Sequence, residues 1–429
     1  MFNIKLIREN KEEVIKNLER RKEPEFIKMV EEVFEKDGEW RKKQFELQKL
    51  KKDKNEINKE IAALKKIGQN ATAKLADAKL IPQKIEVAEL EVVQMKERID
   101  FLLMRIPNLL HETVPYGADD NENVEVKKWG TPKTFDFELK THAEIAEELG
   151  VADFERSRKI AGKGFYFLKG DLALLNQAII RLATELLVKR GYTYVEPPLM
   201  LRREAYEGVT DLADFETVMF KIEDDDRYMI ATAEHPMAAQ FMNETIDEEN
   251  LPLKYVGYSM SFRREIGTRG VDEKGLFRTH QFNKVEQFIF CKPEDSWKFH
   301  EELLKNSEDI FQALGIPYRV VNICTGDIGI VASKKYDVEA WMPRQKQYRE
   351  VCSNSNCTDY QARRLNIRCG KEGGDKRLLH TLNNTAVATS RAMVAILENY
   401  QNKDGTITIP EALRPFMFGK EKIEPLKKF

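Results

Sequence analysis

The sequence predicts an α+β protein in two parts: an antiparallel two-helix coiled-coil arm, then a larger domain built on an antiparallel β-sheet flanked by helices. Two observations carry this prediction. The first third of the chain is rich in Lys and Glu, poor in proline and periodic in the way a helix is. The remainder mixes a few helical segments with short strand-like runs that lack regular crossover helices, which favours an antiparallel sheet over a doubly wound parallel one.

The second helix of the arm has the more regular pattern, because its apolar residues alternate spacings of four and three, as in a coiled-coil seam. These residues are Ile81, Ile85, Ala88, Val92, Met95, Ile99, Leu102, Ile106 and Leu109. The first helix repeats the pattern at Trp40, Leu47, Leu50, Ile57, Ile61 and Leu64. Lys43 and Lys54 interrupt it. Residues 68–78 break both patterns and are the predicted tip, so each helix projects about 45–60 Å.

The charge of the arm is uneven although that of the whole chain is balanced, with 70 Lys and Arg against 72 Asp and Glu. Between Arg41 and Lys66 there are ten basic and four acidic side chains, whereas the returning helix is acidic or neutral. One face of the rod is therefore positive, as binding to a phosphate backbone requires. The alternative is a coiled coil that serves only as a solvated rod or a dimerisation device.

We expect the arm to occupy residues 1–112 and the larger domain residues 113–429, with a linker at 113–150 where proline, glycine and aromatic residues accumulate. A long helix is expected at 171–191. Strands are expected at 192–200, 227–234, 254–265, 283–291, 318–324, 336–343 and 348–354.

The cysteines indicate a reducing compartment, because they are five in number, widely spaced and confined to the last third of the chain. We therefore expect a cytoplasmic protein. The chain has no apolar run of about eighteen residues and its first residues soon become charged, so neither a membrane span nor a signal peptide is expected. Cys352 and Cys357 with His380 match no common zinc spacing, and buried cysteines that bind no metal are the preferred interpretation.

The most informative segment is SMSFRREIGTRGVDEKGLFRTHQFNKVEQFIF, at residues 259–290. It resembles the second signature motif of class II aminoacyl-tRNA synthetases, in the form used by the seryl-tRNA synthetase family. Residues 170–200 resemble motif 1 of that class, and residues 382–417 resemble motif 3. IATAEHP at 230–236 and REVCSNSNCTDYQARR at 349–364 resemble further seryl-type signatures. The resemblance covers essentially the whole chain. The sequence has neither GxxxxGK[ST] nor GxGxxG, so ATP would bind without a glycine cradle.

The resemblance implies an ATP site. Adenylate formation joins two anions, so the site must neutralise negative charge and hold the reactants in line. Arg263 and Arg391 are the implied catalytic residues, on the α- and γ-phosphate, while Arg278 and Phe282 enclose the adenine and bent triphosphate. Glu350 with Ser353 would hold Mg²⁺. The implied ATP-binding set is Arg263, Arg264, Glu265, Arg278, Phe282, Val285, Glu350, Val351, Cys352, Ser353 and Arg391.

The resemblance also implies a serine site, made by Thr232, Ala233, Glu234, Arg263, Glu286, Asn383 and Thr385. Thr232 and Glu234 would surround the substrate amino group, and Glu286 with Thr385 would bind the hydroxyl. A buried carboxylate that lacks a hydroxyl partner disfavours alanine and glycine. Taken alone, Asn383 is also consistent with a turn residue and Thr385 with an ordinary strand residue. His280 is interpreted as a packed histidine and not as an acid or base.

The implied activity is activation of L-serine with ATP and transfer to the 3′ end of serine tRNA, with selenocysteine tRNA as a second candidate acceptor. A homodimer is implied through motif 1. Two alternatives compete: a relative that loads another acceptor, such as a carrier protein, and a catalytically inactive RNA-binding relative. By the family pattern, the first would lack the arm and the second would lose motif arginines. This chain has the arm together with Arg263, Glu265, Arg278 and Arg391.

Overall fold

The computed structural model describes residues 2–265, 275–371 and 373–426. They form two compact units, Met1–Leu109 and Leu110–Phe429. Part of the segment that resembles motif 2, residues 266–274, lies outside the described residues.

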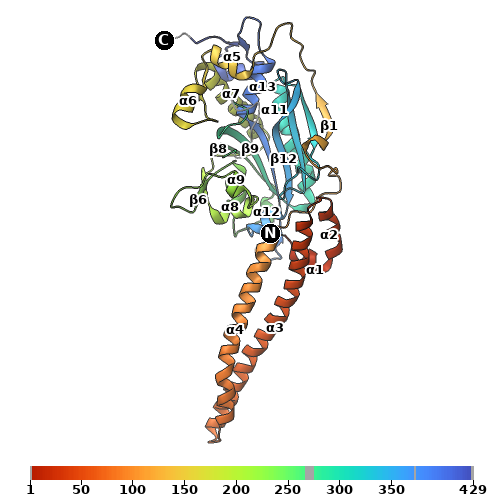
Figure 1. Ribbon diagram of the computed structural model, residues 1–429, viewed down its shortest axis with the longest axis vertical. Helices are drawn as coiled ribbons and strands as arrows, with labels where there is room; N and C mark the ends of the chain where they lie inside the picture. Colours follow the sequence, from red (N-terminus) through yellow and green to blue (C-terminus); the bar gives the residue numbers. More distant parts are fainter. Residues whose placement is uncertain (1, 266–274, 372, 427–429) are drawn as a thin grey trace. The chain divides into compact units, whose positions relative to one another are not determined.

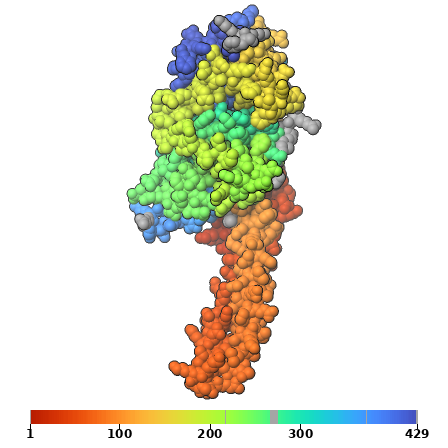
Figure 2. Space-filling view, turned by 90° about the vertical axis from the view of Figure 1, so that its left-hand side faces the viewer, coloured from red at the N-terminus to blue at the C-terminus, as the bar shows by residue number. Residues whose placement is uncertain are grey.

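The first unit is an antiparallel helical hairpin with a small base. Helices α1 (Ile4–Glu9) and α2 (Lys11–Glu19) precede the long α3 (Pro24–Lys66) and α4 (Thr72–Leu103), which pack side by side along their length (Figures 1 and 2). The predicted two-helix coiled coil is confirmed. Buried seam residues include Leu47 and Ile61 of α3 and Ile81, Ile85, Ala88, Val92, Ile99 and Leu102 of α4.

The tip of the hairpin is shorter than the range 68–78 expected from the sequence, since α4 already begins at Thr72. The side chain of Asn70 accepts hydrogen bonds from the backbone nitrogen of Thr72 at 2.8 Å and from its hydroxyl at 2.6 Å. This interaction satisfies a backbone donor that the first turn leaves free. The alanines that follow favour a helix, so residues 72–78 form the first two turns of α4 and are not part of the tip.

Lysine at a seam position of the arm is accommodated by pairing across the hairpin. Lys43 Nζ lies 3.0 Å from Glu91 and 3.4 Å from Glu46. Nearer the tip, Lys74 Nζ lies 2.6 Å from Glu60. Such exposed pairs each contribute about 0–1 kcal/mol, so the apolar seam remains the main source of stability in the arm.

The second unit is organised by one eight-stranded sheet in the order β1-β10-β11-β12-β15-β9-β8-β4. All neighbouring strands are antiparallel except β4 and β8, which confirms the predicted antiparallel sheet. The strands are β1 (Val124–Trp129), β4 (Thr193–Val195), β8 (Leu253–Phe262), β9 (Gln281–Cys291), β10 (Tyr318–Asn322), β11 (Lys334–Met342), β12 (Gln347–Thr358) and β15 (His380–Ala388).

Shorter strands and the helices surround this sheet. The helices are α5 (His142–Glu148), α6 (Phe154–Ala161), α7 (Gly170–Lys189), α8 (Arg203–Val209), α9 (Asp214–Thr217), α10 (Glu234–Ala239), α11 (Ser296–Ala313), α12 (Tyr360–Arg364) and α13 (Thr389–Asn399). The shorter strands are β2 (Ala152–Asp153), β3 (Phe167–Leu168), β5 (Met200–Arg202), β6 (Arg227–Met229), β7 (Thr245–Ile246), β13 (Arg368–Cys369), β14 (Arg377–Leu378), β16 (Ile407–Thr408) and β17 (Lys422–Ile423).

The segment 113–150, expected as a linker, contains regular structure. It supplies edge strand β1 of the main sheet and helix α5, which begins with a capping box between Thr141 and Glu144. Most of β1 is exposed, so its residues do not form the hydrophobic run that identifies a buried strand.

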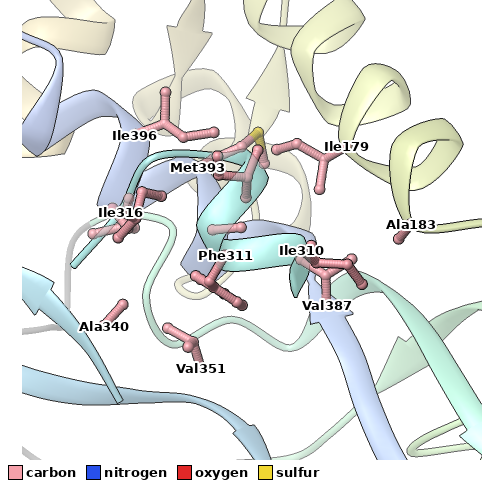
Figure 3. Close-up of a cluster of buried hydrophobic side chains, with 14 of the residues drawn as sticks. Ile179, Ala183, Ile310, Phe311, Ile316, Ala340, Val351, Val387, Met393 and Ile396 are labelled. Carbon is pink, nitrogen blue, oxygen red and sulfur yellow. The ribbon is translucent and has the colours of Figure 1, made fainter. Parts of the chain in front are cut away.

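The two faces of the sheet differ. One face is covered by α7, α11 and α13, whose apolar side chains, such as Ile179, Phe311 and Met393, pack with strand residues such as Val387 (Figures 1 and 3). On the other face, α8, α10 and α12 cover only one end, around Phe288 and Phe290. The rest of that face carries polar side chains. Among the described residues, no helix is both long and apolar enough to cross a membrane.

Candidate active site

Strand β9 carries three side chains on the polar face of the sheet, of which two were predicted as site residues and one was not. Phe282, Lys284 and Glu286 line cavities there, whereas Val285 and Ile289 belong to the core on the other face. This follows from the two-residue repeat of a strand. Lys284 was not among the residues predicted from the sequence, although the same alternation identifies it.

A bulge in β12 brings Glu350 and Ser353 to the same face. Val338 pairs with Cys352, and the next residue, Glu339, pairs with Glu350, so Val351 is an extra residue in the ladder. Residues three apart in a regular strand point to opposite faces, and one inserted residue corrects this. Glu350 and Ser353 consequently line the same cavity, while Cys352 is buried in the core.

Close approach of a loop to the sheet depends on Gly257 of β8, which lies opposite Glu286. A Cβ atom at this position would meet Met237 Sδ at 2.7 Å and Ala233 Cβ at 3.2 Å. Glycine therefore lets the start of α10 lie against β8 and β9. As a result, the hydroxyl of Thr232 comes within 3.4 Å of Glu286 Oε2.

Two cavities adjoin on this face, because Arg263, Lys284, Glu350 and Thr385 line both. The larger has a volume of about 520 Å³ and also contains Thr232, Glu234, Glu286, Ser353 and Asn383. The smaller also contains Glu265, Phe277, Arg278, Phe282, Val351 and Arg391. The structure thus gathers most of the residues singled out for serine in one cavity and most of those singled out for ATP around both.

Polar contacts in the larger cavity connect its acidic groups to fixed donors. Glu234 Oε1 accepts hydrogen bonds from the side-chain amides of Gln361 and Asn383, each at 3.0 Å. Lys284 Nζ lies 2.6 Å from Glu286 Oε2 and donates to Thr232 Oγ1 at 3.2 Å. The carboxylates are therefore held in defined positions before any ligand binds.

Two carboxyl groups of this cavity, those of Glu234 and Glu286, have raised pKa values. Burial, together with the nearby Glu286, raises the pKa of Glu234 to about 7 against the opposing influence of Lys284. Burial also raises the pKa of Glu286, while Lys284 and Arg263 oppose the rise. His235, next to Glu234, has its pKa lowered to about 3 by burial, so its ring is neutral.

Arginines dominate the smaller cavity. Arg278 Nη1 donates to Glu265 Oε2 at 3.2 Å, and Arg391 Nη1 lies 3.1 Å from Glu350 Oε2. The guanidinium of Arg263 lies 5.4 Å from the centre of the Phe282 ring. A cavity with three guanidinium groups beside an aromatic ring suits an anionic ligand that carries a flat ring.

The charge around Glu350 is balanced by cations. Burial alone would raise its pKa, but Arg391, Lys335 and Arg263 lower it to about 2. The group is therefore an anion throughout the physiological range. Beside it, Ser353 pairs in the β-ladder with Asp337 of β11, whose Oδ1 atom is buried without a hydrogen-bond partner. This corner offers several hard oxygen atoms.

Family models match two parts of the chain: "Seryl-tRNA synthetase N-terminal domain" at residues 1–110, and "tRNA synthetase class II core domain (G, H, P, S and T)" at residues 218–400. A curated relative from Methanocella arvoryzae named Serine--tRNA ligase is 55% identical, covering 98% of this chain and all of the relative. This chain belongs to the seryl-tRNA synthetase family.

Solved structures of the family agree with this assignment. The seryl-tRNA synthetase of Pyrococcus horikoshii, complexed with ATP, superposes with a TM-score of 0.95 at 47% identity, covering all of both chains. The cytoplasmic serine-tRNA ligase of Naegleria fowleri, in complex with AMP, gives a TM-score of 0.88 at 37% identity, covering 100% of this chain and 99% of that one.

Four residues implied by the family resemblance do not line either cavity. Ala233, Val285 and Cys352 are buried in hydrophobic clusters, so any contact they make with a ligand would involve the backbone. Arg264 is exposed, and its backbone nitrogen donates to Val218 O at 2.9 Å.

His280 is a packed residue, as the sequence suggested, with Nδ1 2.8 Å from the carbonyl oxygen of Arg263. All five cysteines are free and buried.

Several lining residues were not recognised from the sequence. The guanidinium groups of Arg349 and Arg391 lie 4.4 and 4.9 Å from the ring centre of Phe277. Lys335, Asp214 and the loop 328–332 line the larger cavity. These residues lie far apart in the sequence, so no local pattern predicts them. Lys284 is the exception, because strand alternation places it on the same face as Glu286.

Proposed function

We propose that this chain is a serine–tRNA ligase, which activates L-serine with ATP to seryl-adenylate and pyrophosphate and then transfers serine to the 3′ end of serine tRNA. The observation that carries the proposal is the pair of adjoining cavities: one is lined by fixed carboxylates, which suit an ammonium group and a hydroxyl, and the other is lined by arginines, which suit phosphates. Arg263 lines both. An arginine shared by the two cavities can contact both the serine carboxylate and the α-phosphate of ATP.

In this mechanism the ionised serine carboxylate attacks the α-phosphorus, so no general base is needed. Arg263 would hold the attacking carboxylate and the α-phosphate together, which lowers the cost of bringing two anions into line. Arg391 would bind the γ-phosphate and Arg278 would cover the bent triphosphate, with Phe282 on the other side of the adenine. Glu265 would accept a hydrogen bond from the adenine amino group. Arginine suits these roles since its planar fork binds two oxygens at once.

Magnesium is the proposed cofactor, held by Glu350 and Ser353. The donor set fits, because both are hard oxygen ligands that the β12 bulge places on one face, and Asp337 beside them has an unsatisfied buried oxygen. A divalent ion bound there would neutralise charge on the phosphates of ATP. Lowering of the Glu350 pKa by Arg391 keeps this carboxylate ionised and ready to bind a cation.

Serine recognition is proposed for the larger cavity. Glu234 and the Thr232 segment would bind the ammonium group, and Glu286 with Thr385 would bind the hydroxyl, with Asn383 holding Glu234 in place. Alanine would leave the buried Glu286 without its partner, which disfavours alanine strongly. Threonine would be disfavoured by the packing around the hydroxyl-bearing carbon.

We propose that residues 1–112 bind tRNA and residues 113–429 form the catalytic domain. The basic side chains of α3 support a role for the arm in contacting the tRNA backbone. A cytoplasmic location is part of the proposal and fits the five free cysteines.

A homodimer through α7 and β4 is likewise proposed. Strand β4 is an edge strand of the main sheet, and four large apolar side chains near it are exposed: Val188, Tyr194, Leu199 and Met200. An exposed apolar edge of this kind is a typical association surface. Sedimentation at micromolar concentration tests this part: a dimer is expected, and a monomer would contradict it.

The activity is tested in two steps with the purified protein. Serine-dependent exchange of pyrophosphate into ATP is expected, with far weaker exchange for alanine and threonine; absence of exchange with serine would overturn the proposal. Charging of total tRNA, followed by identification of the charged species, then tests the acceptor. Serine tRNA is the expected product, with selenocysteine tRNA as a second candidate, and failure to charge any tRNA despite exchange would favour a carrier-type acceptor.

A further inference from the structure

We infer that Lys284 is a specificity-determining positioning residue: its ammonium group fixes the carboxylate of Glu286 and the hydroxyl of Thr232 so that Glu286 accepts the side-chain hydroxyl of serine. The inference rests on the proposed function and deepens it. It assigns a role to a residue that the motif resemblance left without one.

The first support is geometry. Lys284 Nζ lies 2.6 Å from Glu286 Oε2 and 3.2 Å from Thr232 Oγ1, and its side chain is only 10% exposed. Thr232 Oγ1 also lies 3.4 Å from the same oxygen of Glu286 and accepts from the backbone nitrogen of Glu234 at 3.3 Å. Both contacts to Glu286 fall on Oε2, which leaves Oε1 for the hydroxyl of serine. Lys284 thereby joins β9 to the start of α10 at the point where the substrate side chain would lie.

The second support is the charge of the cavity. The groups near Glu286 are Lys284 on the same strand, Arg263 after β8, Glu234 on α10 and Thr232 before it, and on the core side of the sheet the thiol of Cys352, whose pKa is raised by burial. With both carboxylates ionised, the two cations balance them, and zwitterionic serine adds no net charge. Without Lys284, two buried carboxylates face one arginine, and the pair would take up a proton at higher pH. A protonated Glu286 binds the hydroxyl with altered geometry.

The position of Lys284 argues against a purely structural role. A lysine with a purely structural role can pair with a carboxylate away from both cavities, as the partly buried Lys254 of β8 does with Glu302 at 2.8 Å. Lys284 instead lines both cavities. Lys254→Met is therefore a matched control, which removes a lysine–glutamate pair from the neighbouring strand without altering the cavity.

The test compares Lys284→Met with Lys254→Met in pyrophosphate exchange, using serine and alanine. Lys284→Met should lower kcat/KM for serine about 10- to 100-fold, mostly through KM, since a charged hydrogen-bond network is lost. The KM for ATP should change by less than about twofold, and the preference for serine over alanine should shrink. Lys284→Arg should restore part of the preference. An equal loss for serine and alanine, or a larger effect on ATP than on serine, would overturn the inference.

A double-mutant cycle separates action through Glu286 from direct contact with the substrate. In a Glu286→Gln background, Lys284→Met should change kcat/KM for serine by less than about threefold, because the carboxylate it positions is gone. If Lys284→Met lowers kcat/KM in this background by as much as it does in the unmodified protein, the inference is overturned.

The pH profile gives a second readout. In Lys284→Met alone, the acid limb of kcat/KM for serine should move to higher pH by about one unit, and an unmoved limb would contradict the inference. No serine-dependent exchange by the unmodified protein overturns the proposed function itself, whereas exchange that Lys284→Met retains in full overturns only this inference.

Discussion

The arm and the catalytic unit are stabilised in different ways, and the contrast explains how function divides between them. In the arm a thin seam of apolar residues such as Val92, which is 8% exposed, is flanked by exposed ion pairs such as Lys43–Glu91. In the catalytic unit, the sheet and three helices enclose a core in which residues such as Ile310 and Met393 are fully buried. The core holds Glu286 away from water on the wall of a cavity, whereas the buried carboxylate of the arm, Asp37 of α3, is already paired with Arg8 and Arg41. We therefore assign the chemistry to the catalytic unit and phosphate binding to the exposed charges of the arm.

The largest expected effect belongs to the catalytic unit. Arg263→Ala should reduce serine-dependent exchange about a thousandfold, because it removes the cation shared by both cavities. Exchange of pyrophosphate measures this directly. Binding of tRNA by the arm should be unchanged in a filter-binding assay, and a comparable loss of tRNA binding would contradict the separation of roles. Arg377→Ala is the control, since this arginine pairs with Glu248 and Glu294 and lines neither cavity.

The next effect belongs to the arm. Removing residues 46–88 and joining the ends with a short glycine linker should lower tRNA charging about a hundredfold through lost phosphate contacts, with serine activation within about twofold of the intact protein. The cut is placed so that Lys43 still faces Glu91 and the apolar cluster at the base of the hairpin, which includes Val33 and Ile99, remains complete. Parallel loss of activation and charging would show that the two units are not functionally separate.

The same contrast explains how much was predictable from the sequence. Regular periodicity reveals the arm, and alternation reveals the strands, since both are local patterns. The shared face of Glu350 and Ser353 was not predictable from spacing alone, because it depends on a bulge at Val351 that has no local signature. The β1 strand was missed for a related reason: its neighbour β10 is far away in the sequence, and its own residues are largely exposed. Family resemblance supplied the roles of the site residues, but not the role of Lys284.

A third prediction concerns pH and sharpens the description of the catalytic unit. Because Glu234 has a pKa of about 7 in the ligand-free cavity and must be ionised to bind the serine ammonium group, kcat/KM for serine should fall up to about tenfold per unit as pH drops below 7. The control is kcat/KM for ATP at saturating serine, which should change less. A profile for serine that stays flat from about pH 8 to pH 6 would contradict this assignment.

The raised pKa of Glu234 also affects stability, with a defined sign. Between its usual value of 4.5 and about 7, the folded state holds a proton that the unfolded chain has released. Stability must therefore decrease as pH rises through that window. Replacing Glu234 by Gln removes this contribution, so the variant should lose less stability than the unmodified protein between these pH values. Burial of Glu234 thus lowers folding stability above about pH 4.5, although the ionised carboxylate is needed to bind the substrate ammonium group.

The smallest expected effect lies on the arm and concerns a single charge. Lys59→Ala on α3 should weaken tRNA charging only a few-fold, about as one phosphate contact predicts, and should lower the slope of log KM for tRNA against log salt by about one. Lys84→Ala is the matched control on α4, whose residues are acidic or neutral on balance, and it should leave the slope unchanged. If both variants alter the slope equally, the positive charge of the arm acts as a diffuse field. If only Lys59→Ala does, the tRNA backbone follows the α3 side of the hairpin, and the difference between the two helices is the feature that orients it.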